Sequence, residues 1–519
     1  MSGDTLKLNH DDTLLGAYEY LNLHTFVRHW PPLSEREIFQ EASLEKRVQL
    51  SLARYSYIHE TRHFHDFFGT LAGVSLFLAH FEMLRSFLTL FELIRRTDET
   101  WSLPFPKWAD TSKFRDIHNR FLRRWSLYRR SAARFTGAFR ATASPKQHTE
   151  DYIVYLETEN ASGKIAAFPF SLGLVEEGVN LSVYYPISFI ALLEGNAQAI
   201  QRTLAEHEFP PEIAIQFTPK KIDHRISQPI EGLDDAFEVV AASSQPYNVT
   251  DYLVSKYLRL TYNQPSFQRE SITRLTDIAL SKSAILPLAE DELGLPTQFQ
   301  VSDVGQNFID ALKQTPMETL VTGEIEYPQV LTTVYKNYLD TILNFPEPET
   351  VDYKGDLLSP LTMLESVLRH EVIAPLIQAR IESKHEVFYS VNEYMKRFIS
   401  LPKVPVLEYE GGLEFAPYMS NKAKDAWSKY VFLSRIVSEI ASGSQVLTCP
   451  RAQGAVGGKG DMSFHFDGEC RDEINRGACN GWYPTRPRVL PKCLFANSLK
   501  ALGAFGGMLP NSAMQPNVK

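Results

Sequence analysis

Residues 57–69 read Tyr-Ile-His-Glu-Thr-Arg-His-Phe-His-Asp-Phe-Phe-Gly, and they contain the pattern His-Glu-x-x-His. An apolar start, helix-compatible residues and Gly69 as a stop favour a helix over this stretch. On a helix, His59 and His63 are one turn apart and project from the same face, so both imidazoles can bind one Zn²⁺ ion. Glu60 lies beside that position, where a carboxylate can take a proton from metal-bound water.

The bulk composition is that of an ordinary globular protein. The chain has 519 residues, enough for two to four domains, with 44% hydrophobic and 22% charged residues. A formal net charge of −9 argues against a general nucleic-acid binder. Residues 1–30 mix Asp, His, Lys and Arg and contain no apolar run, so we expect no secretory signal there.

Cysteine usage points to a reducing compartment. All cysteines fall within the last 71 residues, at Cys449, Cys470, Cys479 and Cys493. A secreted protein stapled by disulfides would spread them more widely, so we expect a cytoplasmic protein. No tight Cys-x-x-Cys pair is present. The cysteines could bind a structural metal ion or an iron–sulfur cluster, or they could be buried thiols.

Hydrophobic periodicity predicts a mainly helical chain. The predicted helices cover residues 34–53, the stretch that ends at 68, and 70–96, 111–139, 187–207, 249–262, 267–283, 303–314, 329–344, 361–384, 387–399 and 421–441. Two strands over 152–157 and 164–170 flank Asn-Ala-Ser-Gly, the signal of a β-hairpin. Residues 1–33 are expected to be irregular. The predicted fold class is mainly α with a small β-hairpin or sheet element (α+β).

Changes in composition suggest three domains. Residues 1–230 would form a helical metal-binding domain that carries the hairpin near 152–170, and residues 231–445 a second helical domain. Residues 446–519 are rich in glycine and cysteine and would form a C-terminal appendage. The oligomeric state does not follow from the sequence.

Two of the predicted helices have unusual compositions. The most apolar segment, residues 71–94, contains His80, Glu82, Arg85 and Glu92, so we interpret it as a buried helix and expect no membrane span. The helix over 111–139 is strongly basic. We interpret it as a solvated face around a buried apolar stripe, although such a helix can also meet membrane or nucleic acid.

Glu194 is a candidate for the third metal ligand. It borders the apolar face of the helix over 187–207, and no Lys or Arg lies three or four residues away to neutralise it. An unpaired carboxylate at such a face is costly unless something pairs with it, and a metal ion would do so. Small residues such as Gly195 would let this helix approach the His59 helix closely.

The segment Glu194-Gly195-x-Ala197 resembles the third-ligand segment of gluzincin metallopeptidases, which reads Asn-Glu-Gly-x-Ala. Together with His59-Glu60-x-x-His63, this resemblance implies a zincin-type zinc site and a peptidase activity. The same family offers an alternative ligand in Glu82, because 18 residues separate it from His63, as in aminopeptidase-like gluzincins. Arg85 follows Glu82 by one helical turn and favours a solvated ion pair instead.

Other residues near the motif have secondary roles. Asp66 and Gln198 are candidates for groups that orient the ligands, although thermolysin-like enzymes carry Asp where this chain has Gln198. His65 follows His63 by two residues and faces elsewhere, so we expect it at the surface. His80 is expected to be a satisfied core or boundary histidine.

The sequence therefore predicts a zinc-dependent hydrolase that acts on a peptide or protein, with Glu60 as its base. One alternative is a non-haem di-iron oxidase or oxygenase, in which Glu60-x-x-His63 pairs with a second Glu-x-x-His at Glu382 to His385. Another alternative is a non-catalytic interaction protein in which the metal only stabilises the helices.

Overall fold

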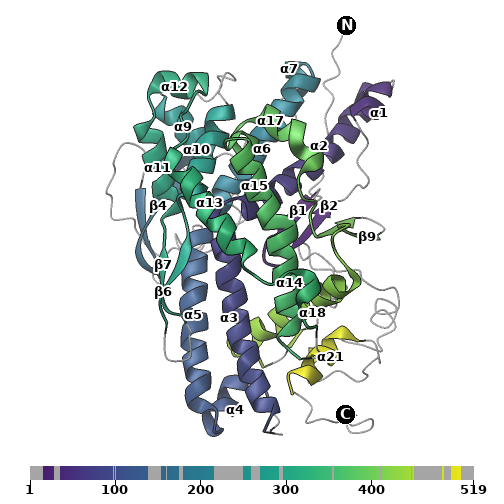
Figure 1. Ribbon diagram of the computed structural model, residues 1–519. Coiled ribbons are helices and arrows are strands. Elements are labelled where there is room, and N and C mark those ends of the chain that lie inside the picture. The colour runs from purple at the N-terminus through teal and green to yellow at the C-terminus, as the bar shows by residue number, and fades with distance from the viewer. Residues whose placement is uncertain are drawn as a thin grey trace.

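The computed structural model describes residues 16–27, 35–41, 43–97, 99, 101–137, 154–158, 161–174, 179–214, 249–258, 269–290, 296–353, 356–409, 412–445, 447–448, 482–483 and 493–503. Over these residues the protein is mainly α with small β-sheets, which confirms the predicted fold class. Long helices pack side by side and form the body of the molecule (Figure 1).

The helices of the first half of the chain are α1 (Glu35–Gln40), α2 (Leu44–Gly69), α3 (Leu71–Arg95), α4 (Phe105–Thr111), α5 (Arg115–Thr136), α6 (Phe189–Glu208), α7 (Pro211–Ala214) and α9 (Val249–Tyr257). The later helices are α10 (Arg269–Ser281), α11 (Val304–Gln314), α12 (Met317–Thr322), α13 (Gln329–Leu343), α14 (Ser359–Leu368), α15 (Ala374–Glu382), α16 (Glu386–Tyr389), α17 (Val391–Arg397), α18 (Asn421–Ala441) and α21 (Leu494–Ala501). A π-helical turn, Arg369–Ile373, joins α14 to α15.

The motif helix α2 is longer than predicted. The sequence predicts one helix to residue 53 and a second from there to 68, whereas a single helix runs from Leu44 to Gly69. Ser43 starts it, because the Ser43 side chain accepts a hydrogen bond from the Lys46 backbone N–H. Thr70 ends it and caps α3 by accepting from the Gly73 N–H.

Four short strands form a sheet that the sequence did not predict. The sheet has the order β1-β2-β8-β9, from β1 (Gly16–Glu19), β2 (His24–Val27), β8 (Val406–Tyr409) and β9 (Gly412–Phe415). The expectation that residues 1–33 are irregular is therefore wrong for β1 and β2. The pair β2–β8 is parallel and joins segments at opposite ends of the chain, whereas the other two pairs are antiparallel.

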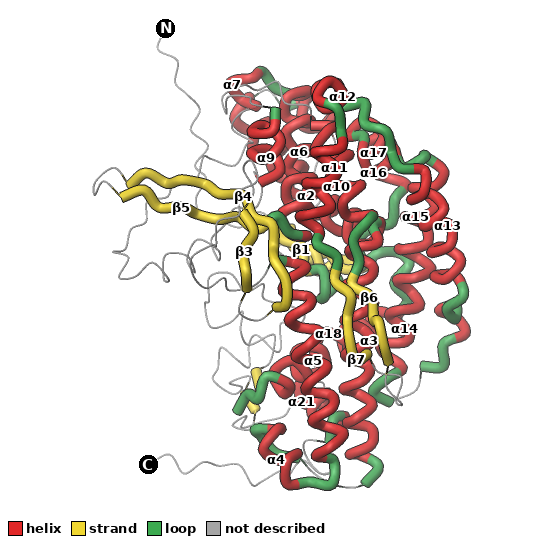
Figure 2. The backbone as a smooth tube through the Cα atoms, turned by 90° about the vertical axis from the view of Figure 1, so that its left-hand side faces the viewer, coloured by secondary structure: helices red, strands yellow, loops and turns green. Residues whose placement is uncertain are grey.

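The predicted hairpin is confirmed, and a third strand extends it. Strands β3 (Val154–Thr158), β4 (Ala161–Leu174) and β5 (Val179–Pro186) form an antiparallel sheet. Figure 2 shows β4 and β5 reaching away from the helical body. A further hairpin of β6 (Ile285–Glu290) and β7 (Pro296–Val301) was not predicted. Strands β10 (Leu447–Thr448) and β11 (Trp482–Tyr483) form a short pair.

Helix α3 lies in the core. By length and composition it could cross a membrane, but 72% of its most apolar stretch is buried inside the protein. This burial supports the predicted role as a core helix, and the expected absence of a membrane span stays a prediction. Along α5, Phe121, Trp125 and Tyr128 are buried, whereas Arg123 and Arg130 are exposed, which fits the predicted solvated basic face.

Helices from the first two predicted domains pack on one another. Helix α2 lies against α15, and α6 lies against α10. At this junction the guanidinium of Arg380 donates to both carboxylate oxygens of Asp277, each at 2.7 Å, and to the Gly69 carbonyl at 2.9 Å. All of these groups are buried. The domain division itself stays a prediction.

The Arg380–Asp277 pair predicts a large effect of mutation. Arg380→Met would leave the Asp277 carboxylate buried without its partner, and we expect the free energy of unfolding to fall by about 3–5 kcal/mol. Lys396→Met is the control, because it removes an exposed Lys396–Glu393 pair and should cost no more than about 1 kcal/mol. Urea denaturation measures both values. Equal effects of the two substitutions would contradict this assignment.

His80 on α3 predicts how stability depends on pH. Its ring faces Trp125 and Tyr128 of α5 and Tyr430 and Ser434 of α18, and burial lowers the pKa of His80 from 6.5 to about 4. The unfolded chain therefore binds a proton below pH 6.5 that the folded chain does not bind.

Stability should thus be complete above pH 6.5 and fall by about 1.4 kcal/mol per unit as pH drops from 6.5 toward 4. His80→Leu should remove this contribution, so its unfolding free energy should show a shallower slope over that range. Identical slopes for the variant and the unmodified protein would overturn the prediction.

Candidate metal centre

The two histidines of the motif project from one face of α2. The ring centroids of His59 and His63 are 4.6 Å apart, and the rings are perpendicular. Only 7% of the His59 side chain and 3% of the His63 side chain are exposed. Buried imidazoles need polar partners, and their Nε2 atoms point to the same place.

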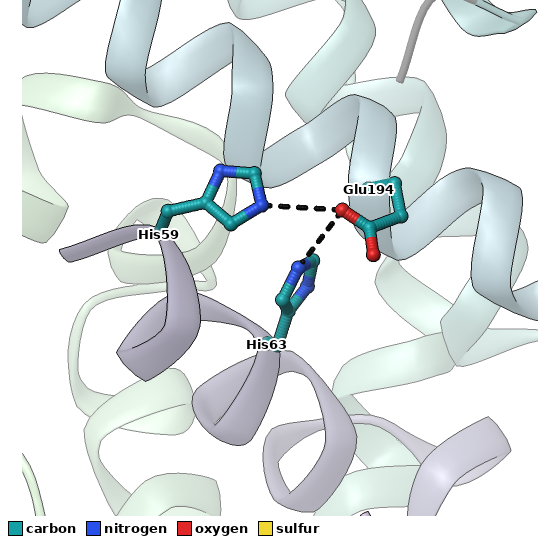
Figure 3. Close-up of side chains that lie close together, drawn as sticks. All are labelled: His59, His63 and Glu194. Carbon is teal, nitrogen blue, oxygen red and sulfur yellow. Dashed lines mark hydrogen bonds and ion pairs between the residues drawn. The ribbon is translucent and has the colours of Figure 1, made fainter. Parts of the chain in front are cut away.

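Helix α6 supplies that partner. The Oε2 atom of Glu194 lies 3.1 Å from Nε2 of His59 and 3.1 Å from Nε2 of His63 (Figure 3). Helix α6 runs antiparallel to α2: Phe189 at its start packs on Phe67, and Glu208 at its end accepts from the Tyr55 hydroxyl at 2.6 Å.

The role predicted for Gly195 differs from what the structure shows. A side chain at Gly195 would begin 2.3 Å from the Thr250 hydroxyl, so this glycine makes room for α9 rather than for α2. Helix α2 instead meets α6 through polar side chains and the Phe67–Phe189 contact. The small residue therefore positions α6 from its far side.

The electrostatics of Glu194 and Glu60 differ sharply. Burial raises the pKa of Glu194, but His63 and His59 outweigh it and hold that pKa well below its usual range. Burial also raises the pKa of Glu60, to about 8; His59 works against this shift and Glu194 adds to it. Glu60 therefore lies within electrostatic reach of two of the candidate ligands.

The candidate metal centre, defined as His59, His63 and Glu194, fits a zinc ion. The three ligand atoms lie within 4.8 Å of one another. Tetrahedral zinc with bonds of about 2.0–2.1 Å holds neighbouring ligand atoms about 3.3 Å apart. The observed separation of 3.1 Å from Glu194 to each histidine is close to that value. Two imidazoles and a carboxylate are also a donor set that zinc prefers.

The structure places Glu82 elsewhere. Its side chain is 42% exposed and accepts from Arg85 at 2.9 Å, and Arg85 also reaches Glu365. Glu82 is therefore part of an ion-pair network on α3, as its sequence context predicted. Glu194, and not Glu82, meets the two histidines.

The second Glu-x-x-His motif is not near the candidate metal centre. The Nε2 atom of His385 lies 2.8 Å from the Thr332 hydroxyl, and its ring stacks on Tyr327. Glu382 accepts a hydrogen bond from Gln378. Over the described part of the chain, His59, His63 and Glu194 are the one group of three side chains arranged to hold a metal ion. The di-iron alternative therefore lacks its second half.

His65 corrects an expectation, because it is buried and not at the surface. Its Nε2 lies 2.8 Å from the Pro402 carbonyl and its Nδ1 lies 3.0 Å from the Tyr394 hydroxyl. A carbonyl only accepts, so Nε2 carries the proton and Nδ1 accepts from Tyr394. Burial lowers the pKa of His65 to about 3.

Asp66 contacts the ligand helix rather than a ligand. Its carboxylate accepts from Asn196 of α6 at 2.7 Å and from Arg62 at 2.9 Å. Gln198, the other predicted orienting residue, is buried on α6. Asn196 and Arg62 had no role in the sequence prediction. The spacing of Arg62 and Asp66, one helical turn apart, was a usable signal of an ion pair.

The predicted second metal or iron–sulfur site falls largely outside the described residues. Cys449, Cys470 and Cys479 all lie outside them. Cys493 is buried at the start of α21, where its sulfur accepts from the Ala496 backbone N–H. The cysteine site therefore stays a prediction.

Comparisons of the chain with protein-family models, with curated proteins and with solved structures found no match. The fold and the site define a structural class only: a mainly helical protein in which a His-Glu-x-x-His helix meets a glutamate from an antiparallel helix. The resemblance to gluzincins rests on those motif residues.

The geometry predicts which carboxylate binds the metal. Glu194→Gln removes the charged ligand and should weaken zinc binding by more than about 100-fold, beyond the 10- to 100-fold typical of residues behind the ligands. Glu82→Gln is the matched control and should leave zinc affinity unchanged. Competition with a chromophoric chelator measures both. A loss in Glu82→Gln with none in Glu194→Gln would reverse the assignment.

Proposed function

We propose that this protein is a zinc-dependent hydrolase that cleaves peptide bonds in a peptide or protein substrate. The observation that supports this most strongly is the 3.1 Å approach of one Glu194 oxygen to Nε2 of both His59 and His63. A chance His-Glu-x-x-His pattern needs no third ligand, whereas this one meets a glutamate 131 residues away from His63. The cytoplasmic location that accompanies the proposal rests on sequence alone.

The residues of the centre divide into ligands and a base. His59, His63 and Glu194 would hold the zinc ion and leave its fourth position for water. When bound, zinc lowers the pKa of such a water to about 7 and polarises a carbonyl group. Burial of the ligands keeps this chemistry in a low dielectric, where electrostatic interactions are stronger.

Glu60 would move the proton. It takes a proton from the water as the water oxygen bonds to the carbonyl carbon, and it gives that proton to the amide nitrogen as the C–N bond breaks. Glu60 is only 7% exposed and follows His59 directly, which places it beside the ligands. A nearby cation favours the charged form of a carboxyl group, so bound zinc would make Glu60 a base at neutral pH.

The test is to separate metal binding from turnover. Glu60→Gln should keep about one equivalent of zinc, because it is not a ligand, and should slow hydrolysis by roughly 10²–10⁴-fold. Metal content is measured by elemental analysis, and turnover with a pool of internally quenched fluorescent peptides of mixed sequence. Glu45→Gln, at the exposed start of α2, is the control and should behave like the unmodified protein.

Other outcomes identify the alternatives. Zinc at one equivalent with no cleavage by the unmodified protein would favour a non-catalytic centre that holds α2 and α6 together. Iron in place of zinc would favour oxidative chemistry, which a centre of two histidines and one carboxylate also supports. Equal cleavage by the Glu60→Gln variant and the unmodified protein would refute the role of Glu60 as base.

A further inference from the structure

Behind the candidate metal centre, a buried polar contact joins α2 to α6. The Asn196 amide donates to Oδ2 of Asp66 at 2.7 Å, and both side chains are 1% exposed. Asp66 follows His63 by three residues on α2, and Asn196 follows Glu194 by two residues on α6. The contact therefore joins the two ligand-bearing helices within one turn of the ligands.

We propose that Asp66 and Asn196 are positioning residues of the metal centre, and that their hydrogen bond sets where Glu194 lies relative to the two histidines. This inference rests on the proposed metal centre. A buried hydrogen bond to a charged group is short and directional, so it limits both the rotation of α6 and its sliding along α2. Either motion would carry Glu194 away from His59 and His63.

Arg62 holds Asp66 in place from its other side. Its guanidinium donates to Oδ1 of Asp66 at 2.9 Å and to the Phe388 carbonyl, and it lies 4.5 Å from the centre of the Tyr394 ring. The Asp66 carboxylate is thereby paired and cannot turn away from Asn196. The chain of contacts runs from α16 and α17 through α2 to α6.

Within the described residues, no other polar contact of these side chains competes with this one. The Oδ1 atom of Asn196 is buried and has no hydrogen-bond partner there, so the single bond to Asp66 orients its amide. The Nδ1 atom of His63 also has no partner there, although metal-binding histidines usually gain orientation from such a bond. Placement of the helices, rather than a bond to this ring, must then fix the ligand geometry.

A second polar contact between the same helices serves as a control. Near the other end of the pair, the Tyr55 hydroxyl donates to Glu208 at 2.6 Å. Tyr55 and Asp66 are about 16 Å apart along α2, from the helical rise of about 1.5 Å per residue. Tyr55→Phe removes a buried helix–helix hydrogen bond of the same kind, far from the ligands.

The experiment compares zinc affinity with stability in the absence of metal. Asn196→Ala should weaken zinc binding 10- to 100-fold, the range typical of residues behind metal ligands, as measured by chelator competition. Tyr55→Phe should change the zinc dissociation constant less than about twofold by the same criterion. Thermal melting of the metal-free proteins reports any general loss of folding in either variant.

A charge test removes the ambiguity of a destabilised variant. Asn196→Asp puts two buried carboxylates against each other and should weaken zinc binding more than Asn196→Ala. The exchange D66N/N196D restores one donor and one acceptor and should recover at least tenfold of that loss.

Equal zinc affinity in the unmodified protein and in Asn196→Ala would overturn the inference and leave the metal centre standing. Equal losses in Asn196→Ala and Tyr55→Phe would also overturn it, because general helix packing would then explain both. If the unmodified protein binds no zinc, the proposed function fails with it, which is a separate and recognisable result.

Discussion

The structure depends on one constraint: the second half of α2 is buried on all sides although much of it is polar. Every residue from Ile58 to Gly69 is buried. Polar groups inside a protein are costly unless they are paired, so each must find a partner in another element or on its own helix. The partners come from α6 for the ligand histidines and from α16, α17 and the segment after them for Arg62 and His65.

The same burial gives the candidate centre its chemical asymmetry. Glu194 and Glu60 are both buried carboxyls, yet the pKa of one is lowered and the pKa of the other is raised. The difference arises because Glu194 faces both imidazoles, whereas Glu60 lies beside one imidazole and beside the Glu194 charge. Titratable pairs whose environments push their pKa values apart are the usual basis for assigning separate roles to similar side chains.

Local sequence signals predicted the long helices and the choice between two glutamates. Glu194 has no basic neighbour on its own helix and was therefore expected to find a partner elsewhere, whereas Glu82 has Arg85 and pairs with it. The strands β1 and β2 escaped prediction because each has only four residues, and part of their pairing lies with β8, far along the chain. No local pattern carries that information.

His65 shows a second limit of sequence reasoning. Facing away from His63 implies exposure only if one side of a helix is solvated, and α2 has no solvated side in this region. Its partners Tyr394 and Pro402 lie more than 300 residues away, so no helical periodicity could indicate them. The ion pair of Arg62 with Asp66 was readable from spacing, but the acceptor at Phe388 was not.

These distances in sequence have a consequence for how the protein is made. The acceptor for Arg62 at Phe388 lies 326 residues downstream. At a synthesis rate of roughly 5–20 residues per second, α2 must wait on the order of 16–65 s on the ribosome before that partner emerges. During that time, its apolar and charged side chains share a surface with no complete set of neighbours. The most chemically informative helix of the nascent chain is thus among the first to be synthesised and among the last to be enclosed.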